Sequence, residues 1–427
     1  MNLTRLLIHK RIFIILILFP FISFAQPSKE NVNPLQVNLF EVNFLPSNDS
    51  TDCYVSFNIP YNRLIYVKNG DLFSGGVEIF FDVKLNNKID HRKYYSKNLS
   101  VNSYDETQNK DKFLEGVISL RLANKDYVIQ PSLKIGNTNQ TIKLDSITIN
   151  LSRIHENIFY KPLVVENIGN SCSDKQALFR LVNRNNKIPF AARKYSLFIP
   201  VNSDSIKEAL IKIEQPGQVV YDQKVIVNPS RNLIIDECDG SIVIASSSLL
   251  NNSNYILLED FSQKLTEGPV TVKVINGSNE SSFLINVEWL NKPVTLFNIN
   301  LAVELLELIY DRAELLDLYK SSNQNKYKAL VDFWNKKFPE REYMFNEWMD
   351  EFYKRSDYAM QNFSNLANQI GAKTDRGKIY IQYGKPDEIK RDYSSTNNVV
   401  EIWFYKDLQK EFIFTDRTGL GNYILSK

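Results

Sequence analysis

The sequence predicts a multidomain protein: two tandem antiparallel β-sandwich (Ig-like) domains followed by an α+β C-terminal domain with three helices and then a small antiparallel sheet. The length of 427 residues corresponds to about two to four domains of ordinary size. Apolar residues alternate with period two before about residue 290, and they follow a helical period after it. We expect the domains at 26–158, 159–293 and 294–427, after a signal peptide at 1–25.

The N-terminus has the pattern of a secretory signal peptide. Arg5, Lys10 and Arg11 precede an apolar run over 12–22, and small residues lead to a cleavage point after Ala25. About 11 apolar residues span only ~16 Å as a helix, roughly half of the hydrocarbon core of a membrane. We therefore expect cleavage, no transmembrane segment in the mature chain, and a location in the periplasm or at the outer cell surface.

The charge balance argues against nucleic acid or an anionic membrane as a partner. Lys and Arg number 51 and Asp and Glu number 49. Without the signal peptide, which carries three basic residues and no acid, the chain keeps 48 basic and 49 acidic residues. Such a balance gives no overall electrostatic attraction to a polyanion.

The two regions before residue 290 share one strand pattern. Short runs of alternating apolar residues, such as Cys53-Val55-Phe57, are separated by clusters of Asn, Asp, Gly and Ser, which is typical of antiparallel strands with one solvated face. Gln215-Pro216-Gly217 predicts a tight turn between two strands. Asn276-Gly277 predicts a second hairpin, with a loop longer than two residues.

Three cysteines remain after cleavage: Cys53, Cys172 and Cys238. Cys53 alternates with Val55 and Phe57, so we expect it to be a buried free thiol. An exported chain permits disulfides, and the sequence leaves open a bridge between Cys172 and Cys238, although free thiols are the simpler interpretation.

After about residue 300 the period becomes helical. The apolar stripes predict helices over 305–316, 327–338 and 345–366, and Pro339 ends the second. We assign their aromatic residues to the core, because they share a face with the aliphatic residues. Strands are then expected at 378–383, 399–405, 411–414 and 422–425.

Residues 371–388 form the one distinctive motif. Gly371 is expected to end a helix, and Thr374 and Asp375 to bond backbone N–H groups in a turn. Gly377 would open a strand, and Gly384 would permit a positive φ at its far end. The interpretation is therefore turn, strand, turn, with Asp387 capping the second turn.

This segment resembles the GWxTD-domain family, whose signature runs Gly-Trp-x-Thr-Asp-x-Gly and continues to Tyr-Gly-x-Pro-Asp-Glu. Ala372 stands where the family has Trp, so a large apolar surface is missing here. The resemblance covers 298–427 and implies an exported protein of a bacterial cell envelope, often with β domains ahead of the motif. It brings no catalytic residue. The matching residues are Gly371, Thr374, Asp375, Gly377, Tyr383, Gly384, Pro386, Asp387 and Glu388.

The acids of the motif could be interpreted as a catalytic pair or a metal site. A hydrolytic pair needs carboxylates about 5–10 Å apart, whereas the predicted strand holds Asp375 and Asp387 about 20 Å apart. We therefore interpret them as turn-forming acids paired with Arg376 and Arg391, and expect neither a metal nor a cofactor.

Other catalytic chemistry has little support in the sequence. His91 and His155 are the only histidines after the signal peptide, and both lie in β-type regions. No nucleophile elbow, zinc-ligand spacing or phosphate-binding loop accompanies them. The sequence does not exclude an enzyme that uses only carboxylates or lysines.

The leading hypothesis is a non-enzymatic envelope protein whose C-terminal domain binds a protein partner. The alternative is a carbohydrate-binding or carbohydrate-hydrolysing envelope protein, which requires a row of exposed aromatic rings and two carboxylates facing one cleft. As binding residues we select the motif positions Thr374, Asp375, Arg376, Tyr383, Asp387 and Glu388.

Overall fold

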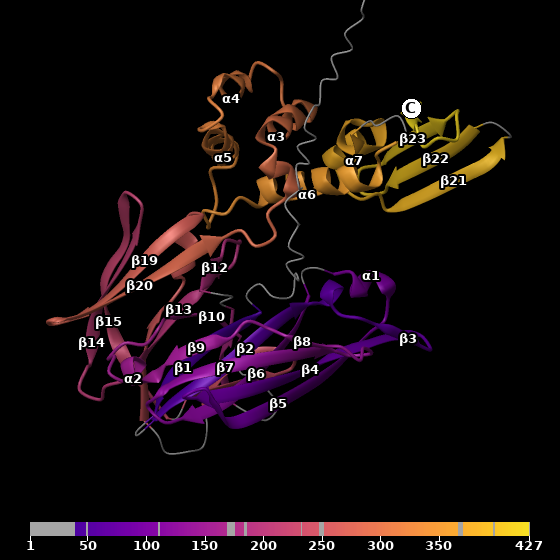
Figure 1. The fold of residues 1–427 in the computed structure, drawn as a ribbon. Coiled ribbons are helices and arrows are strands. Elements are labelled where there is room, and N and C mark those ends of the chain that lie inside the picture. The colour runs from indigo at the N-terminus through magenta and orange to yellow at the C-terminus, as the bar shows by residue number, and fades with distance from the viewer. Residues whose placement is uncertain are drawn as a thin grey trace, which may run out of the picture. The chain divides into compact units, whose positions relative to one another are not determined.

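The computed structural model describes residues 39–426 except 48–49, 110–111, 169–175, 183–185, 232, 247–251, 366–369 and 396–397. The predicted signal peptide, Cys172 and Leu366 therefore lie outside the described residues. The described chain is mostly β-strand in several sheets, with a few helices and a small antiparallel sheet at the C-terminus (Figure 1).

The N-terminal β region is sandwich-like. One sheet has the order β1-β2-β6, and the other contains β3, β4, β5, β7, β8 and β9. Rings of the two sheets meet between them, with centroids 5.4 Å apart for Phe40 and Phe81 and 5.0 Å apart for Phe57 and Tyr95. The strands are β1 (Phe40–Ser47), β2 (Ser50–Pro60), β3 (Val67–Asn69), β4 (Leu72–Leu85), β5 (Lys88–Val101), β6 (Phe113–Leu122), β7 (Asp126–Ile135), β8 (Thr141–Lys143) and β9 (Ile147–Asn150), with short helices α1 (Tyr104–Thr107) and α2 (Leu151–Ile154).

Cys53 confirms the strand pattern from which its burial was predicted. It is a free thiol with no exposed surface, and Val55 and Phe57 on the same face of β2 are equally buried. Burial raises the pKa of the Cys53 thiol well above its usual range. Cys238 is disulfide-bonded, so the simpler interpretation that all three thiols are free is wrong.

The second β region forms one continuous path of eleven strands, in the order β12-β20-β19-β14-β15-β18-β13-β10-β11-β17-β16. The long strand β15 connects two halves of this path, because it pairs with β14 at one end and with β18 at the other. A core of Val, Ile and Leu residues lies against these strands. The bounds are β10 (Leu163–Asn167), β11 (Gln176–Leu181), β12 (Lys187–Pro189), β13 (Ser196–Val201), β14 (Glu208–Gln215), β15 (Gln218–Arg231), β16 (Leu233–Cys238), β17 (Ser241–Ser246), β18 (Asn252–Leu258), β19 (Gly268–Asn276) and β20 (Asn279–Glu288).

Both predicted hairpins are present. Gly217 has φ +89° in the turn between β14 and β15, as the Pro-Gly pair predicted. Gly277 has φ +59° between β19 and β20. Because Asn276 pairs directly with Asn279, the second loop has two residues, and the longer loop expected from the sequence is wrong.

The predicted first helix over 305–316 is wrong. Helix α3 (Ile299–Leu305) passes into a 3₁₀ turn over 306–308, and α4 (Leu316–Lys320) begins separately. The stripe failed because its members do not share one face: Leu305 and Leu306 are buried, whereas Ile309 and Leu316 are exposed. The second and third predicted helices correspond to α5 (Lys326–Lys337) and α6 (Glu347–Asn362).

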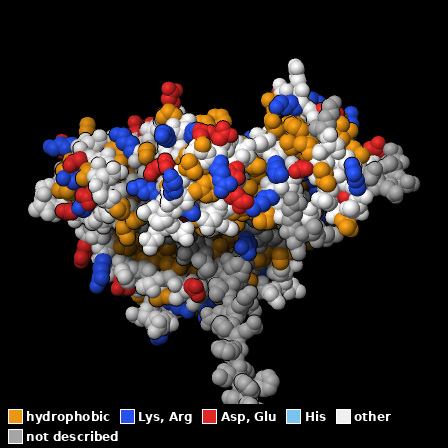
Figure 2. Space-filling view, turned by 90° about the horizontal axis from the view of Figure 1, so that it is seen from above, with side chains coloured by type: hydrophobic (Ala, Val, Ile, Leu, Met, Phe, Trp, Pro, Cys, Tyr) orange, Lys and Arg blue, Asp and Glu red, His pale blue; other side chains and the backbone are white. Residues whose placement is uncertain are grey.

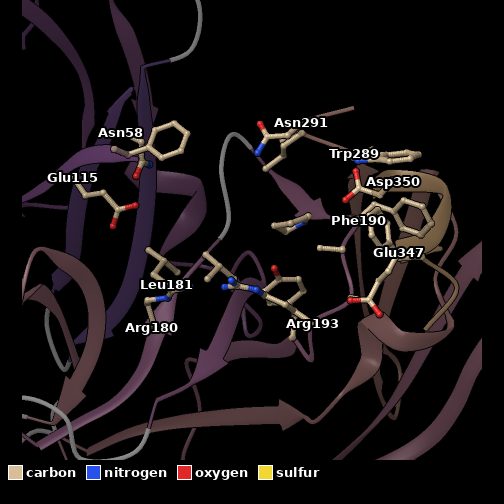
Figure 3. A pocket seen from close by; sticks show the side chains of 18 of the residues that line it. Asn58, Glu115, Arg180, Leu181, Phe190, Arg193, Trp289, Asn291, Glu347 and Asp350 are labelled. Carbon is tan, nitrogen blue, oxygen red and sulfur yellow. The ribbon is translucent and has the colours of Figure 1, made fainter. Parts of the chain in front are cut away.

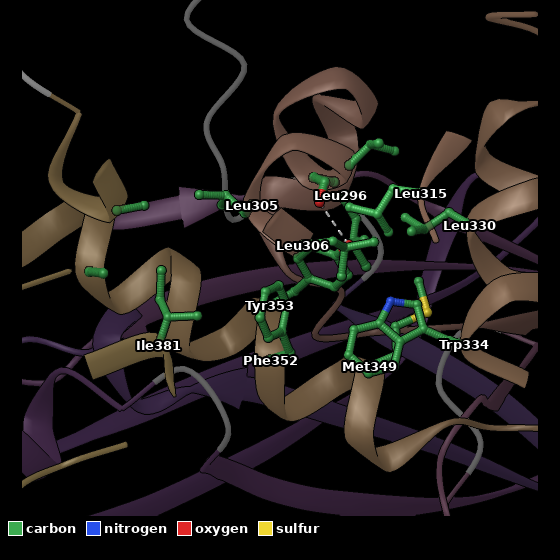
Figure 4. Packing of buried hydrophobic residues seen from close by; sticks show 14 of the residues in the cluster. Leu296, Leu305, Leu306, Leu315, Leu330, Trp334, Met349, Phe352, Tyr353 and Ile381 are labelled. Carbon is green, nitrogen blue, oxygen red and sulfur yellow. Dashed lines mark hydrogen bonds between the residues drawn. The ribbon is translucent and has the colours of Figure 1, made fainter. Parts of the chain in front are cut away.

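Most aromatic residues of these helices lie in the core, as expected (Figure 4), but Trp348 on α6 is 61% exposed, so its assignment to the core is wrong. Trp334 on α5 packs against Phe352 and Tyr353 on α6, with ring centroids 5.5 and 6.2 Å away. The Tyr353 hydroxyl donates to the carbonyl of Ala302, 2.9 Å away, so the polar end of this fully buried side chain is satisfied. These contacts fix α6 against α3 and α5.

The chain ends in a four-stranded sheet of order β21-β22-β23-β24, beside which helix α7 (Asp375–Tyr383) lies (Figure 1). The strands are β21 (Glu388–Ser395), β22 (Asn398–Tyr405), β23 (Lys410–Asp416) and β24 (Ile424–Leu425). Within the described residues, no helix combines the length and apolar character needed to cross a membrane. Basic and acidic side chains are interspersed over the face drawn in Figure 2.

Candidate functional site

The motif forms a capped helix, and the predicted strand over 378–383 is wrong. Thr374 precedes helix α7, and its Oγ1 accepts a hydrogen bond from the N–H of Gly377 at 3.1 Å. The same hydroxyl donates to the Gly371 carbonyl at 2.8 Å. Asp375 follows as the first helical residue, where the helix dipole favours an acid. Thr-Asp was therefore a helix N-cap signal, which the alternation of Ile and Tyr after it obscured.

Gly371 and Gly377 allow backbones to approach closely. A Cβ on Gly377 would overlap the Gly371 carbonyl oxygen, and a Cβ on Gly371 would overlap the carbonyl oxygen of Ala359 in α6. Gly371 lies in a 3₁₀ turn over 371–373, and neither glycine is among the residues with positive φ. The roles expected for them, ending a helix and opening a strand, are wrong, whereas Gly384 does have a positive φ of +81°.

Ala372, at the position of the family's Trp, has no exposed surface and belongs to the core of the C-terminal region. A side chain at this position therefore contributes to packing within the domain.

A buried carboxylate, Glu401, lies at the centre of the motif region. It is 1% exposed on β22, and it accepts hydrogen bonds from Arg391 Nε at 2.8 Å, Trp403 Nε1 at 2.7 Å and Arg376 Nη1 at 3.4 Å. Burial alone would raise the pKa of Glu401, but these donors outweigh it and hold the pKa below the usual range. Glu401 connects the motif helix to the terminal sheet.

Sequence reasoning missed Glu401, although a signal was present. On a period-two strand, Glu401 shares the face of Trp403 and Tyr405, so it was an acid at a core position. Such a carboxylate requires a buried cation, and Arg376 was the available partner in the motif.

Arg376 and Asp375 hold the end of the chain. The guanidinium of Arg376 lies 3.9 Å from the ring centroid of Tyr423, and Oδ2 of Asp375 accepts the N–H of Leu425 in β24 at 3.0 Å. The two residues therefore fix the last strand against the start of α7.

At the other end of α7, the motif residues close the sheet. The Tyr383 ring packs 5.1 Å from Phe412. Asp387 Oδ2 accepts the backbone N–H of Lys406 at 2.7 Å, so it caps a turn, although the turn follows β22. Glu388 begins β21, and Lys390 lies 3.5 Å from its carboxylate. The structure thus groups Thr374, Asp375 and Arg376 at one end, and Tyr383, Asp387 and Glu388 at the other.

The part of the chain that contains this Thr-capped helix and the terminal sheet is similar to a known protein family. Residues 280–425 match the family model of the GWxTD domain. The match begins within β20, before the boundary at 294 expected from the sequence. No curated protein matches the chain.

A hollow of about 560 Å³ lies beside the GWxTD domain (Figure 3). Three aromatic residues, Phe190, Trp289 and Phe345, pack edge to face in its wall. Asp350 on α6 also lines it; burial raises the pKa of its carboxyl, although Lys354 at 2.8 Å opposes the shift. None of the described lining residues comes from the motif at 371–388.

The described residues contain no group of three or more His, Cys, Asp or Glu side chains placed to hold a metal ion. The motif carboxylates are instead engaged as acceptors of backbone N–H groups or as partners of lysines. Their expected pairing with Arg376 and Arg391 is wrong, because both arginines contact Glu401 on β22.

Proposed function

We propose that the chain is an exported bacterial envelope protein that acts as a non-enzymatic interaction or structural module. One observation carries this proposal: the motif side chains are used to build the GWxTD domain. Thr374 caps a helix, Arg376 neutralises Glu401, and Asp387 bonds a backbone N–H. A motif used in this way provides a rigid support for a binding surface.

The rest of the proposal concerns the organisation of the chain. We infer a cleaved signal peptide over 1–25, two tandem Ig-like sandwiches over 26–158 and 159–293, and the GWxTD domain over 294–427. The sandwiches would act as spacers or docking surfaces, and the protein would lie in the periplasm or at the outer surface. The sandwich-like packing of the first region and the match at 280–425 support this organisation.

Glu388 is the motif position best placed to contact a protein partner. Its side chain is 43% exposed, and its contacts with Lys390 and Lys406 are long, at 3.5 and 3.9 Å. The partner would then present a basic group to this end of β21. The other selected positions have their side chains committed within the domain and would support this surface from below.

Affinity capture from native envelope extract tests the proposal. The mature chain should retain a specific partner, and Glu388→Lys should reduce its recovery severalfold, since like charges at a contact repel. Glu411→Lys, an exposed acid on β23, is the matched control and should have no effect. A mature chain that retains no partner and turns over a small substrate would overturn the proposal.

The carbohydrate-active alternative has no comparable support in the geometry. Asp375 and Asp387 bond backbone amides of different segments, Leu425 and Lys406. Trp289, Trp334 and Trp403 are buried, and although Trp348 is 61% exposed, it lies on α6, away from both acids in the chain.

A further inference from the structure

A second hollow, of about 360 Å³, lies among the helices that begin the GWxTD domain. It is separate from the motif, and no feature described above uses it. Its lining residues come from α3 and the turn after it, from the segment around α4, and from the start of α5: Asn300, Val303, Glu304, Glu307, Arg312, Tyr319 and Lys326.

Lys326 is a buried cation with an incomplete set of partners. The residue is 9% exposed, and Nζ donates to Oδ1 of Asn300 at 2.8 Å. In the described part of the chain this neutral amide is its one hydrogen-bond acceptor. An ammonium group has three donors, and a buried charge without an opposite charge is costly. Two donors of Lys326 are therefore available to a ligand.

The position of Lys326 in α5 increases the positive potential there. It is the first residue of a twelve-residue helix, at the positive end of the helix dipole. Asn325, the N-cap residue, makes no capping hydrogen bond with its side chain. The charge of the ammonium group and the positive end of the helix dipole therefore add at this wall, which favours an anion.

The more exposed wall of the hollow carries the opposite charge. Glu304 and Glu307 have side chains 49% and 38% exposed. One oxygen of Glu307 accepts the Tyr319 hydroxyl at 2.8 Å and lies 3.9 Å from Nε of Arg312, and the corresponding oxygen of Glu304 contacts Lys373 at 2.6 Å. Among the described residues, the second oxygen of each carboxylate accepts no hydrogen bond, so each acid keeps one oxygen that can accept from a cationic group.

We propose that this hollow binds a small zwitterion of the α-amino-acid type, with its carboxylate at Lys326 and its ammonium at Glu304 and Glu307. A simple anion would be repelled by the two acids, and a simple cation by Lys326. A ligand with both charges matches both walls. The volume lies within the range of small-molecule sites, about 300–1,000 Å³. This binding activity goes beyond the interaction role proposed above and does not depend on it.

Calorimetric titration of the purified mature chain with each free amino acid tests the proposal, with acetate and methylammonium as probes that carry one charge only. At least one amino acid should bind at millimolar concentration or below, and both single-charge probes should bind at least about tenfold more weakly. Lys326→Met should weaken binding of that amino acid about tenfold or more. Lys328→Met, an exposed lysine on the same helix, should leave it unchanged.

Two further variants separate loss of binding from loss of folding. Lys326→Arg keeps the charge and should retain measurable binding. The double variant Glu304→Gln/Glu307→Gln should weaken amino-acid binding but strengthen acetate binding, an outcome that general unfolding cannot produce. The proposal is overturned if no amino acid binds the wild-type chain, or if a folded Lys326→Met variant binds as well as the wild type.

Discussion

Two cations are buried in the same C-terminal region, and their surroundings differ. The Arg376 side chain is 12% exposed and contacts the carboxylate of Glu401 and the ring of Tyr423. Lys326 is 9% exposed, and among the described residues its Nζ makes a hydrogen bond only to a neutral amide. Both lie at the start of a helix, at its first or second residue.

The difference distinguishes a structural charge from one that is available for binding. Removing one partner of a buried ion pair leaves an uncompensated charge and is strongly destabilising. Removing a buried charge that has no charged partner relieves a desolvation cost. Proteins often retain such unfavourable groups where function requires them. Stability measurements can therefore test whether Arg376 and Lys326 have these different roles.

The largest effect is expected for Glu401→Ala. This variant leaves Arg376 and Arg391 without their shared carboxylate, and it should lower the free energy of unfolding by about 3–5 kcal/mol, as measured by urea denaturation. Glu388→Ala is the control, since Glu388 is exposed on the same sheet, and it should change stability by less than about 0.5 kcal/mol. Equal losses of stability in the two variants would contradict the assignment of Glu401 as a buried carboxylate that stabilises the domain.

A smaller loss is expected for Arg376→Met. Glu401 keeps Arg391 and Trp403 as donors, so the cost should be about 2 kcal/mol. The thermal unfolding midpoint and urea denaturation both report it. Lys378→Met, an exposed neighbour on α7 whose Nζ lies 3.4 Å from Asp375, should cost less than about 0.5 kcal/mol. If Arg376→Met leaves the free energy of unfolding unchanged, Arg376 does not have the structural role assigned to it.

The N-cap of the motif helix should contribute less to the free energy of unfolding than Arg376 does. Thr374→Ala removes the acceptor of the Gly377 N–H and should cost about 1 kcal/mol. Thr374→Ser retains the capping oxygen and should restore most of the loss. If Ser proves no better than Ala, the capping interpretation of the motif is wrong.

The smallest effect on stability is expected for Lys326→Met, measured without ligand. Since the ammonium has no carboxylate partner among the described residues, the free energy of unfolding should stay unchanged or rise by up to about 1 kcal/mol. Urea denaturation beside Arg376→Met makes the comparison direct. A loss as large as that of Arg376→Met would show that Lys326 is a structural charge.

The sequence was sufficient where one residue or one face decides the structure. Cys53, Val55 and Phe57 lie on the buried face of a strand because alternation places them together. Gly217 adopts a positive φ because Pro-Gly favours that turn. The apolar stripes of α5 and α6 also identified core residues such as Leu330, Trp334 and Phe352, although Trp348 of the same pattern is exposed.

Sequence reasoning failed where a local capping signal was overlooked and where contacts between different elements decide the structure. The segment 378–383 alternates as a strand does, but the Thr374 cap and the contact between Gly371 and Gly377 place it in a helix. The role of Glu401 depends on Arg376, which lies on a different element. Lys326 reads in the sequence as an ordinary surface lysine, and only its burial against Asn300 distinguishes it.

The sequence by itself determined the change from period-two strands to helices, the turns that contain glycine, and the GWxTD motif at 371–388. These features depend on the intrinsic conformational preferences of neighbouring residues. The tertiary structure decided which charges are neutralised, at Arg376 and Glu401, and which is left without a charged partner among the described residues, at Lys326. That outcome depends on burial and on contacts across elements, because the free energy of a charge is set by the surroundings in which the fold places it.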